Sequence, residues 1–143
     1  MRIQIKRIDN TFPLPQYQSH GAVGFDLICR EKTVVEPHSI ELIPSNVIVK
    51  VPEGYMLMVV PRSSTPAKYG LIIPNSPGII DQDYNGPEDE IKIQVLNILD
   101  DPVVVERGDR IAQGIFVKIE KGEWEEFEHS GDDLSRGGFG STG

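Results

Sequence analysis

Apolar and polar side chains alternate in short runs along most of the chain. The alternation is clearest in residues 2–8 and 90–99, and a period of two residues is typical of a β-strand with one buried face. In residues 23–29, Asp26 stands between two apolar residues and is therefore expected to face the opposite side of the strand. Strands are predicted at residues 2–8, 23–29, 33–35, 40–43, 47–51, 55–60, 71–73, 78–80, 90–99, 103–105 and 110–119, with an additional edge strand at residues 124–127.

Turn-forming residues separate these runs, and no long stretch shows helical periodicity. The chain contains 14 Gly and 11 Pro, which fits many tight turns. One short helix is predicted within residues 61–70, where Ser64 or Thr65 can cap the start. Pro66 suits its first turn and Gly70 suits its end. Short strands and turns at even spacing predict an all-β sandwich or barrel with one short helix.

The composition narrows the class of protein. A chain of 143 residues with 38% hydrophobic and 25% charged residues is typical of one globular domain. A net charge of −8, without a run of Lys or Arg, argues against a broad nucleic-acid or anionic-membrane surface. The longest apolar run, residues 56–60, is too short to span a membrane, and no signal peptide is evident. We therefore expect a soluble intracellular protein, in the cytoplasm, with its only cysteine, Cys29, packed as a small hydrophobic residue.

The segment of residues 78–86 carries the most distinctive chemistry. Asp81 follows the predicted strand 78–80, at the point where a sheet gives way to a loop. A carboxylate held there can activate a water or bind a cation, and the neighbouring Tyr84 can stack on a sugar or a base. The alternative is a hairpin whose aspartates only cap the turn. Asn75, just before this segment, can pair with a base edge or can satisfy the loop backbone.

Two further segments suggest an anion site. Arg62, Ser63 and Ser64 precede the predicted helix, so a guanidinium, two hydroxyls and helix N–H groups can converge on a phosphate. The alternative is an ordinary serine cap beside a surface arginine. Arg110 and Gln113 stand in a turn that leads into a strand, where they can point at a phosphate or belong to a charged hairpin.

The three histidines lack metal-ligand spacing, which argues against a zinc site.

The last residues differ in character from the rest. Residues 131–143 have almost nothing to bury, which predicts a β domain of residues 1–130 followed by a mobile glycine-rich arm of residues 131–143. Phe139 in the middle of this arm suggests that it lands on another surface. The bare backbone amides and hydroxyls around Phe139 can wrap a phosphate.

Five segments, taken in order, resemble the motifs of the homotrimeric deoxyuridine triphosphatases (dUTPases). The resemblance runs from about residue 21 to the last residue. The segments are Gly24-Phe25-Asp26-Leu27, Pro61-Arg62-Ser63-Ser64, Gly78-Ile79-Ile80-Asp81-Gln82-Asp83-Tyr84-Asn85-Gly86, Arg107-Gly108-Asp109-Arg110-Ile111-Ala112-Gln113 and Arg136-Gly137-Gly138-Phe139-Gly140-Ser141-Thr142-Gly143.

The resemblance implies a jelly-roll-like β fold, a homotrimer, and sites shared between subunits. It implies Mg²⁺-dependent hydrolysis of dUTP to dUMP and pyrophosphate. In this sequence Asp81 matches the general base that activates the attacking water, and Tyr84 matches the ring that packs on deoxyribose. Asn75 and Gly78 fall in the hairpin that reads uracil, where a 5-methyl group would clash.

The remaining matched residues would hold the triphosphate and its metal. The resemblance places Asp26 on waters of the Mg²⁺, as a ligand through water, and Phe139 over the uracil. Phosphate contacts would come from Arg62, Ser63, Ser64 and Gln113, and on the closing arm from Arg136, Gly140, Ser141 and Thr142.

The sequence departs from the family pattern at two positions, and two rival functions compete with the one that the resemblance implies. Ser64 replaces the usual glycine of the second motif, and Arg136 stands three residues before Phe139 where the family arginine stands five before. The similar dCTP deaminases use a glutamate where this chain has Gln94, and a neutral amide cannot take a proton from water. The second rival is a catalytically idle β-trimer that binds a nucleotide or a protein.

Overall fold

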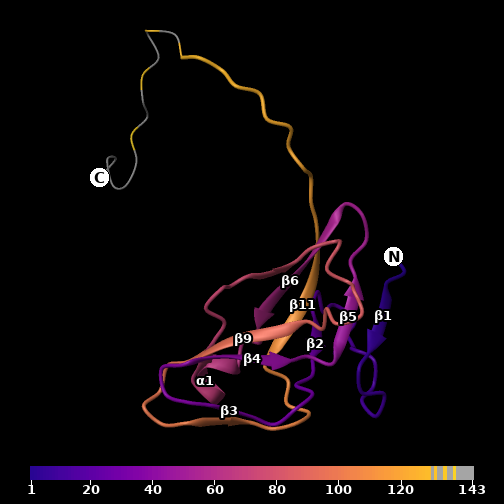
Figure 1. The fold of residues 1–143 in the computed structure, drawn as a ribbon, viewed down its shortest axis with the longest axis vertical. Helices are drawn as coiled ribbons and strands as arrows, with labels where there is room; N and C mark the ends of the chain where they lie inside the picture. Colours follow the sequence, from indigo (N-terminus) through magenta and orange to yellow (C-terminus); the bar gives the residue numbers. More distant parts are fainter. Residues whose placement is uncertain (130, 132–133, 135–136, 138–143) are drawn as a thin grey trace.

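The structure is a computed structural model that describes residues 1–129 together with Gly131, Leu134 and Gly137. Its elements follow the chain in the order shown in Figure 1. Within the described residues, no helix is long and apolar enough to cross a membrane. The elements are β1 (Gln4–Arg7), β2 (Phe25–Leu27), β3 (Thr33–Val35), β4 (Ile40–Pro44), β5 (Val47–Lys50), β6 (Tyr55–Pro61), α1 (Thr65–Tyr69), β7 (Leu71–Ile72), β8 (Gly78–Ile80), β9 (Lys92–Asn97), β10 (Val103–Val105) and β11 (Ala112–Lys118).

The strands form antiparallel sheets that enclose one apolar core. The larger sheet has the order β2-β11-β6-β8 and the smaller has the order β4-β9-β7, while β1 pairs with β5 and β3 pairs with β10. In Figure 1 strand β9 crosses in front of β11, and β4 runs beside β9. Side chains from both sheets fill the space between them, among them the fully buried Leu27, Ile43, Leu57, Ile93 and Val95.

The predicted strands between residues 2 and 119, which together form the β body, are all present, with small differences at their ends. Where the sequence alternates, the alternation reflects one buried face of the strand, for example Ile93 and Val95 of β9 between less buried neighbours. β2 and the first three residues of β5 are instead buried throughout. Cys29 is fully buried as predicted, and burial raises the pKa of its thiol to about 12.

The additional edge strand predicted at residues 124–127 is wrong. Trp124 is 98% exposed and Phe127 is 78% exposed, and no strand is formed there. Figure 1 shows this part of the chain leaving the β body, so it has no neighbouring strand with which to pair. Within the described residues, this segment adds no side chain to the apolar core.

The predicted helix is present but its capping differs from the prediction. Ser64 is the N-cap residue, yet its side chain makes no capping hydrogen bond. Thr65 is buried instead, and its hydroxyl donates to the Ile111 carbonyl at 2.6 Å, which ties the helix to the chain before β11. Gly70 ends the helix in the left-handed conformation at φ 64°, as the sequence predicted.

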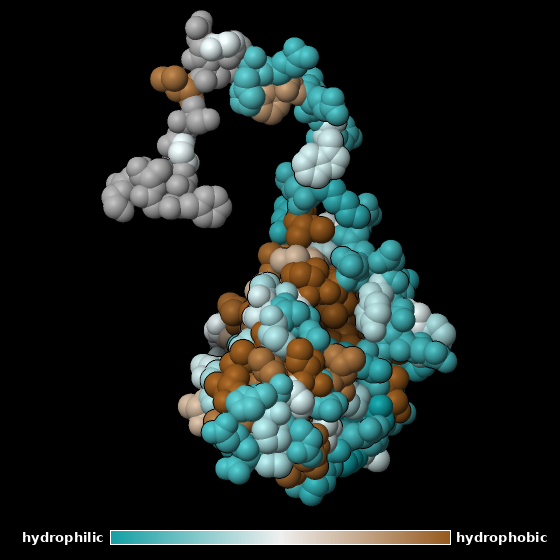
Figure 2. Space-filling model, turned by 60° about the vertical axis from the view of Figure 1, so that its left-hand side comes forward, coloured by the Kyte–Doolittle hydropathy of each residue, from teal (hydrophilic) through white to brown (hydrophobic). Residues whose placement is uncertain are grey.

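The outer face of the larger sheet is unusually apolar. Along β6, Leu57 and Val59 point into the core, so Met56, Met58 and Val60 point outward. Their outward neighbours in β11 and β8 include Ile115, Val117 and Ile79. No described part of this chain makes a further sheet layer over that face. Figure 2 shows apolar surface spread over the β body, in contrast to the mostly hydrophilic segment that leaves it.

Candidate active site

Two arginines converge on one buried carboxylate beside the larger sheet. Asp26 in β2 is only 6% exposed. Its Oδ1 lies 3.0 Å from Nε of Arg62, and its Oδ2 lies 3.0 Å from Nη1 of Arg110. Arg62 also donates to the Arg110 carbonyl at 3.3 Å. Two guanidinium groups sharing one carboxylate leave an excess of positive charge, which favours an anion such as a phosphate.

The pairing of β11 creates this cluster. β11 lies between β2 and β6, and its register places Gln113 opposite both Asp26 and Val60. The Gln113 side chain donates to the Pro61 carbonyl at 3.3 Å. Gly24 leaves the room that Gln113 needs, because a Cβ on Gly24 would lie 2.6 Å from the Gln113 Oε1. Three segments that lie far apart in the sequence therefore meet at one end of the sheet.

Asp26 points away from the core as predicted, but its side chain is buried and not exposed to solvent. Phe25 and Leu27 point into the core, and Asp26 points to the other side, where the two arginines cover it. Ser63 and Ser64 are exposed on the segment between Arg62 and α1. A cavity of about 330 Å³ opens beside Asp26 and Arg110, and it is lined mostly by residues of the loop 12–18.

Asp81 lies at the opposite end of the same sheet. It follows β8, which pairs with β6, and its side chain is exposed on the wall of a cavity of about 310 Å³. Among the described residues its carboxylate accepts no hydrogen bond. The turn is capped instead by Asp89, which accepts the Gly86 N–H at 2.6 Å. This geometry argues against the turn-capping alternative for Asp81 and leaves its carboxylate open to a water.

The loop after Asp81 is held by its own polar side chains. Gln82 donates to the Tyr55 carbonyl of β6 at 3.0 Å, and Asn85 donates to the Gln82 carbonyl at 2.8 Å. Tyr84 is partly exposed, and its hydroxyl lies 3.4 Å from the Glu90 carbonyl. Asn75 is exposed in the turn before β8, close to Gly78.

A single chain does not bring the Asp81 carboxylate and the cluster of Asp26, Arg62 and Arg110 together. The register between β6 and β8 places Asp81 beside Met56, whereas Arg62 follows the other end of β6. Six residues of extended strand span about 20 Å. The apolar outer face of the sheet lies between the two groups, with Met58 near its middle.

Comparisons with known proteins identify the family. The dUTPase family model matches residues 10–143. The chain belongs to the dUTPase family. A deoxyuridine 5'-triphosphate nucleotidohydrolase of Helicobacter pylori (strain Shi470) is 41% identical over 145 residues, covering 100% of this chain and 97% of that protein. One of Hydrogenobaculum sp. is 40% identical, covering 100% of this chain and 99% of that protein.

Solved dUTPase structures share the fold. The crystal structure of dUTPase from Streptococcus mutans has a TM-score of 0.77 and 34% identity, covering 84% of this chain and 98% of that one. The dUTPase of Staphylococcus bacteriophage 80alpha with dUPNHPP has a TM-score of 0.84 and 26% identity, covering 99% of this chain and 98% of that one. These matches confirm the jelly-roll-like all-β architecture expected for this dUTPase.

Part of the site predicted for this dUTPase lies outside the described residues. The residues concerned are those of the fifth motif, and their predicted contacts stay predictions. They are Arg136, Phe139, Gly140, Ser141 and Thr142.

The structure also adds a residue that sequence reasoning missed. Glu90, the last of three consecutive acidic residues, is 7% exposed, and its two carboxylate oxygens each accept a hydrogen bond from Arg30. The local sequence of this dUTPase does not reveal the partner of Glu90, because Arg30 lies 60 positions away. The only available signal was an acidic residue directly before the apolar Ile91 of a predicted strand.

Proposed function

We propose that this dUTPase hydrolyses dUTP to dUMP and pyrophosphate, and so limits uracil in DNA. The main support for this proposal is the exposed Asp81 carboxylate. It lies at the end of β8 and accepts no hydrogen bond among the described residues. In this role Asp81 takes a proton from the water that attacks the α-phosphorus. The names of the relatives, and the phage dUTPase solved with dUPNHPP, support a uracil nucleotide as the substrate.

The cluster around Asp26 is suited to the triphosphate. Arg62 and Arg110 direct guanidinium groups to one spot, and the exposed Ser63 and Ser64 add hydroxyl and backbone donors. Gln113 lies at the same end of the sheet. Donors placed in advance around a phosphate stabilise the charge that moves to the leaving pyrophosphate.

The base and the sugar would bind on the Asp81 side. Asn75 and Gly78 belong to the turn that leads into β8, where a tight backbone can read the uracil edge. The partly exposed ring of Tyr84 provides a wall against which deoxyribose can pack, leaving no room for a 2′-hydroxyl.

The residues present fit a Mg²⁺ ion that arrives with the nucleotide. Among the described residues, no group of three or more His, Cys, Asp or Glu side chains could hold a metal by itself. Mg²⁺ is usually bound through one or two carboxylates, waters and substrate phosphates. Asp26 is the carboxylate at the phosphate end of the site, and since both its oxygens already bind arginines, it would act through a water. When bound, the ion would neutralise part of the triphosphate charge.

We place the complete site between copies of the chain, in a homotrimer. Asp81 and the Asp26 cluster are about 20 Å apart along β6, too far for one nucleotide to bridge water and phosphate on one chain. The apolar outer face between them suits contact with a second copy. Such contact can bring the Asp81 of one copy to the Arg62 of the next.

The closing element of the site would be the arm of residues 131–143, which follows the β domain of residues 1–130. Residues 120–129, which lead toward it, are all exposed and leave the body (Figure 1). In this proposal Phe139 covers the uracil, and Arg136, Gly140, Ser141 and Thr142 hold the γ-phosphate. Ordering on the nucleotide would exclude water from the site.

Purified protein incubated with dUTP or dCTP tests the proposed function. We expect pyrophosphate release from dUTP, loss of activity with EDTA and recovery with Mg²⁺. Ammonia release from dCTP would identify a deaminase, which Gln94 argues against because its amide cannot act as a base. Binding of dUTP without any turnover would identify an idle binding protein and contradict the proposal.

A further inference from the structure

A partly buried ion pair lies at the end of the loop that carries Asp81. The Arg30 Nε lies 2.8 Å from Oε1 of Glu90, and the Arg30 Nη2 lies 2.9 Å from Oε2, which makes a forked interaction. The side chains are 23% and 10% exposed. The hydrogen bonds to Glu90 raise the pKa of the Arg30 guanidinium.

The carboxylate also holds a strained backbone turn. Glu90 Oε1 accepts the Asn46 N–H at 2.8 Å, and Asn46 adopts a left-handed conformation at φ 72°. The Asn46 side chain in turn accepts the Asp9 N–H at 2.6 Å and donates to the Asp9 carbonyl at 3.0 Å. Glu90 therefore connects the end of the loop to three other segments. These are Arg30 in the segment after β2, Asn46 in the turn between β4 and β5, and, through Asn46, Asp9 in the turn after β1.

The loop between β8 and β9 contains no strand, and side chains near its start and its end attach it to the rest of the chain. At its start Gln82 binds the Tyr55 carbonyl of β6. At its end the Glu90 side chain is buried against Arg30, and the Glu90 carbonyl lies within reach of the Tyr84 hydroxyl. The positions of Asp81 and Tyr84 thus depend on both attachments.

We propose that Glu90, through its forked pair with Arg30, is a positioning residue that sets the placement of Asp81 and Tyr84 in the complete site. The inference rests on the proposed function. A buried ion pair is often replaceable by apolar residues at little cost in stability, so stability alone gives no reason for one here. A directional, forked contact at the end of an irregular loop fixes geometry, and a 1 Å displacement of a catalytic group can cost about 100-fold in rate.

The test separates placement from folding with a charge-free double variant. In Glu90→Gln with Arg30→Met, the glutamine oxygen can still accept the Asn46 N–H while both charges are absent. We expect a melting temperature within about 3 °C of the wild type, but a kcat for dUTP at least about 10-fold lower. Wild-type kcat in this variant would overturn the proposal.

A matched control and a second variant complete the design. The exposed pair Lys32 and Glu106, 2.9 Å apart, is changed in the same way by Lys32→Met with Glu106→Gln and should leave kcat unchanged. If the first double variant does not fold, Arg30→Lys keeps the charge and loses the fork. A reduced kcat in Arg30→Lys with an unchanged melting temperature supports placement, and an unchanged kcat contradicts it.

Amide hydrogen exchange distinguishes this inference from the proposed function. In the charge-free double variant, the amides of residues 82–89 should exchange faster while those of β6 stay protected. If the wild type does not turn over dUTP, the proposed function fails, and exchange still tests the anchoring. If the wild type is active and loop exchange is unchanged, only the anchoring is wrong.

Discussion

Replacement of Asp81 by asparagine is expected to lower dUTP turnover by about 10²- to 10⁴-fold while nucleotide binding is retained. Asparagine has nearly the same shape as aspartate, but its neutral amide cannot accept a proton from water. The exposed carboxylate makes no hydrogen bond that would be lost among the described residues, so the fold should be unaffected. Single-turnover pyrophosphate release and titration calorimetry with dUTP measure the two quantities separately.

Asp83 provides the matched control for this prediction. It is exposed in the same turn, two residues from Asp81, and it has no proposed role in the chemistry. Asp83→Asn should therefore keep turnover within about threefold of the wild type, as for a surface substitution. Unchanged turnover in Asp81→Asn would refute the general-base assignment, and an equal loss in both variants would attribute the effect to the charge of the turn.

Deletion of residues 136–143 is expected to lower turnover by at least about 10²-fold without unfolding the protein. The removed residues include Phe139 and the proposed γ-phosphate contacts, so the site would stay open to water. The β body should be unaffected because the residues that lead to the arm, 120–129, are exposed and take part in none of its sheets. Turnover and the melting temperature are measured on the same preparation, and a collapsed melting temperature would contradict a separate arm.

The strands that bury one face were predictable from their alternation. A period of two residues at positions 92–97 is a local property, and β9 shows it directly. The edge strand at residues 124–127 failed because alternation alone does not supply a partner strand, and Trp124 is exposed here. Ser64 is the N-cap residue as predicted, but its side chain makes no capping hydrogen bond, and the hydroxyl of Thr65 binds the Ile111 carbonyl, 46 positions away.

The site was predictable in its parts but not in its assembly. Motif chemistry indicated that Arg62 and Arg110 could bind a phosphate, but their meeting at Asp26 depends on the register of β11 between two other strands. The burial of Glu90 depends in the same way on a distant partner, Arg30. Contacts of this kind are set by the tertiary fold, and no local pattern contains them.

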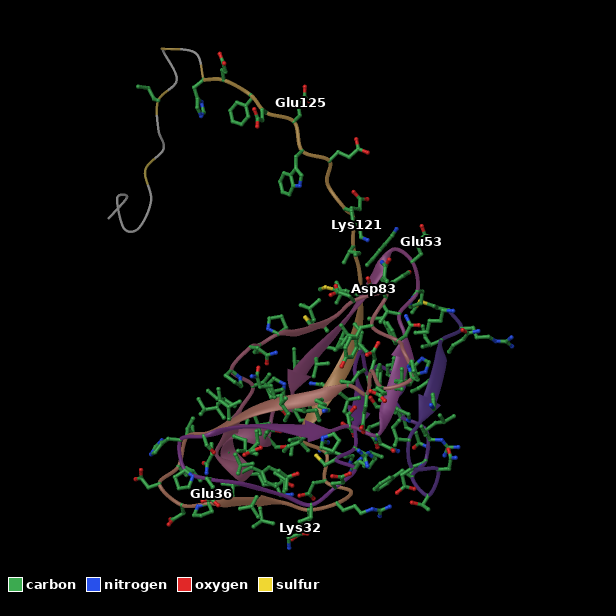
Figure 3. The ribbon with its side chains drawn as sticks, viewed as in Figure 1. Lys32, Glu36, Glu53, Asp83, Lys121 and Glu125 are labelled. Carbon is green, nitrogen blue, oxygen red and sulfur yellow. The ribbon has the colours of Figure 1, made fainter. Side chains whose placement is uncertain are left out.

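Figure 3 shows Asp83, in the loop that carries Asp81, at the end of the β body from which Lys121 and the following residues leave. The helix α1, which follows Arg62, lies toward the other end of the body in the same orientation (Figure 1). In the proposed trimer, the general base and the main phosphate-binding residues of one site therefore come from different copies of the chain.

Mixed assemblies test that arrangement most directly. Copies carrying Arg62→Ala and copies carrying Asp81→Asn, each inactive alone, would be co-expressed with two different tags and purified for both tags. In every mixed trimer with sites shared between neighbours, one of the three sites has both intact residues, so about one third of wild-type turnover is expected. Mixed assemblies as inactive as the two parent variants would show that each site lies within one chain and would contradict the account.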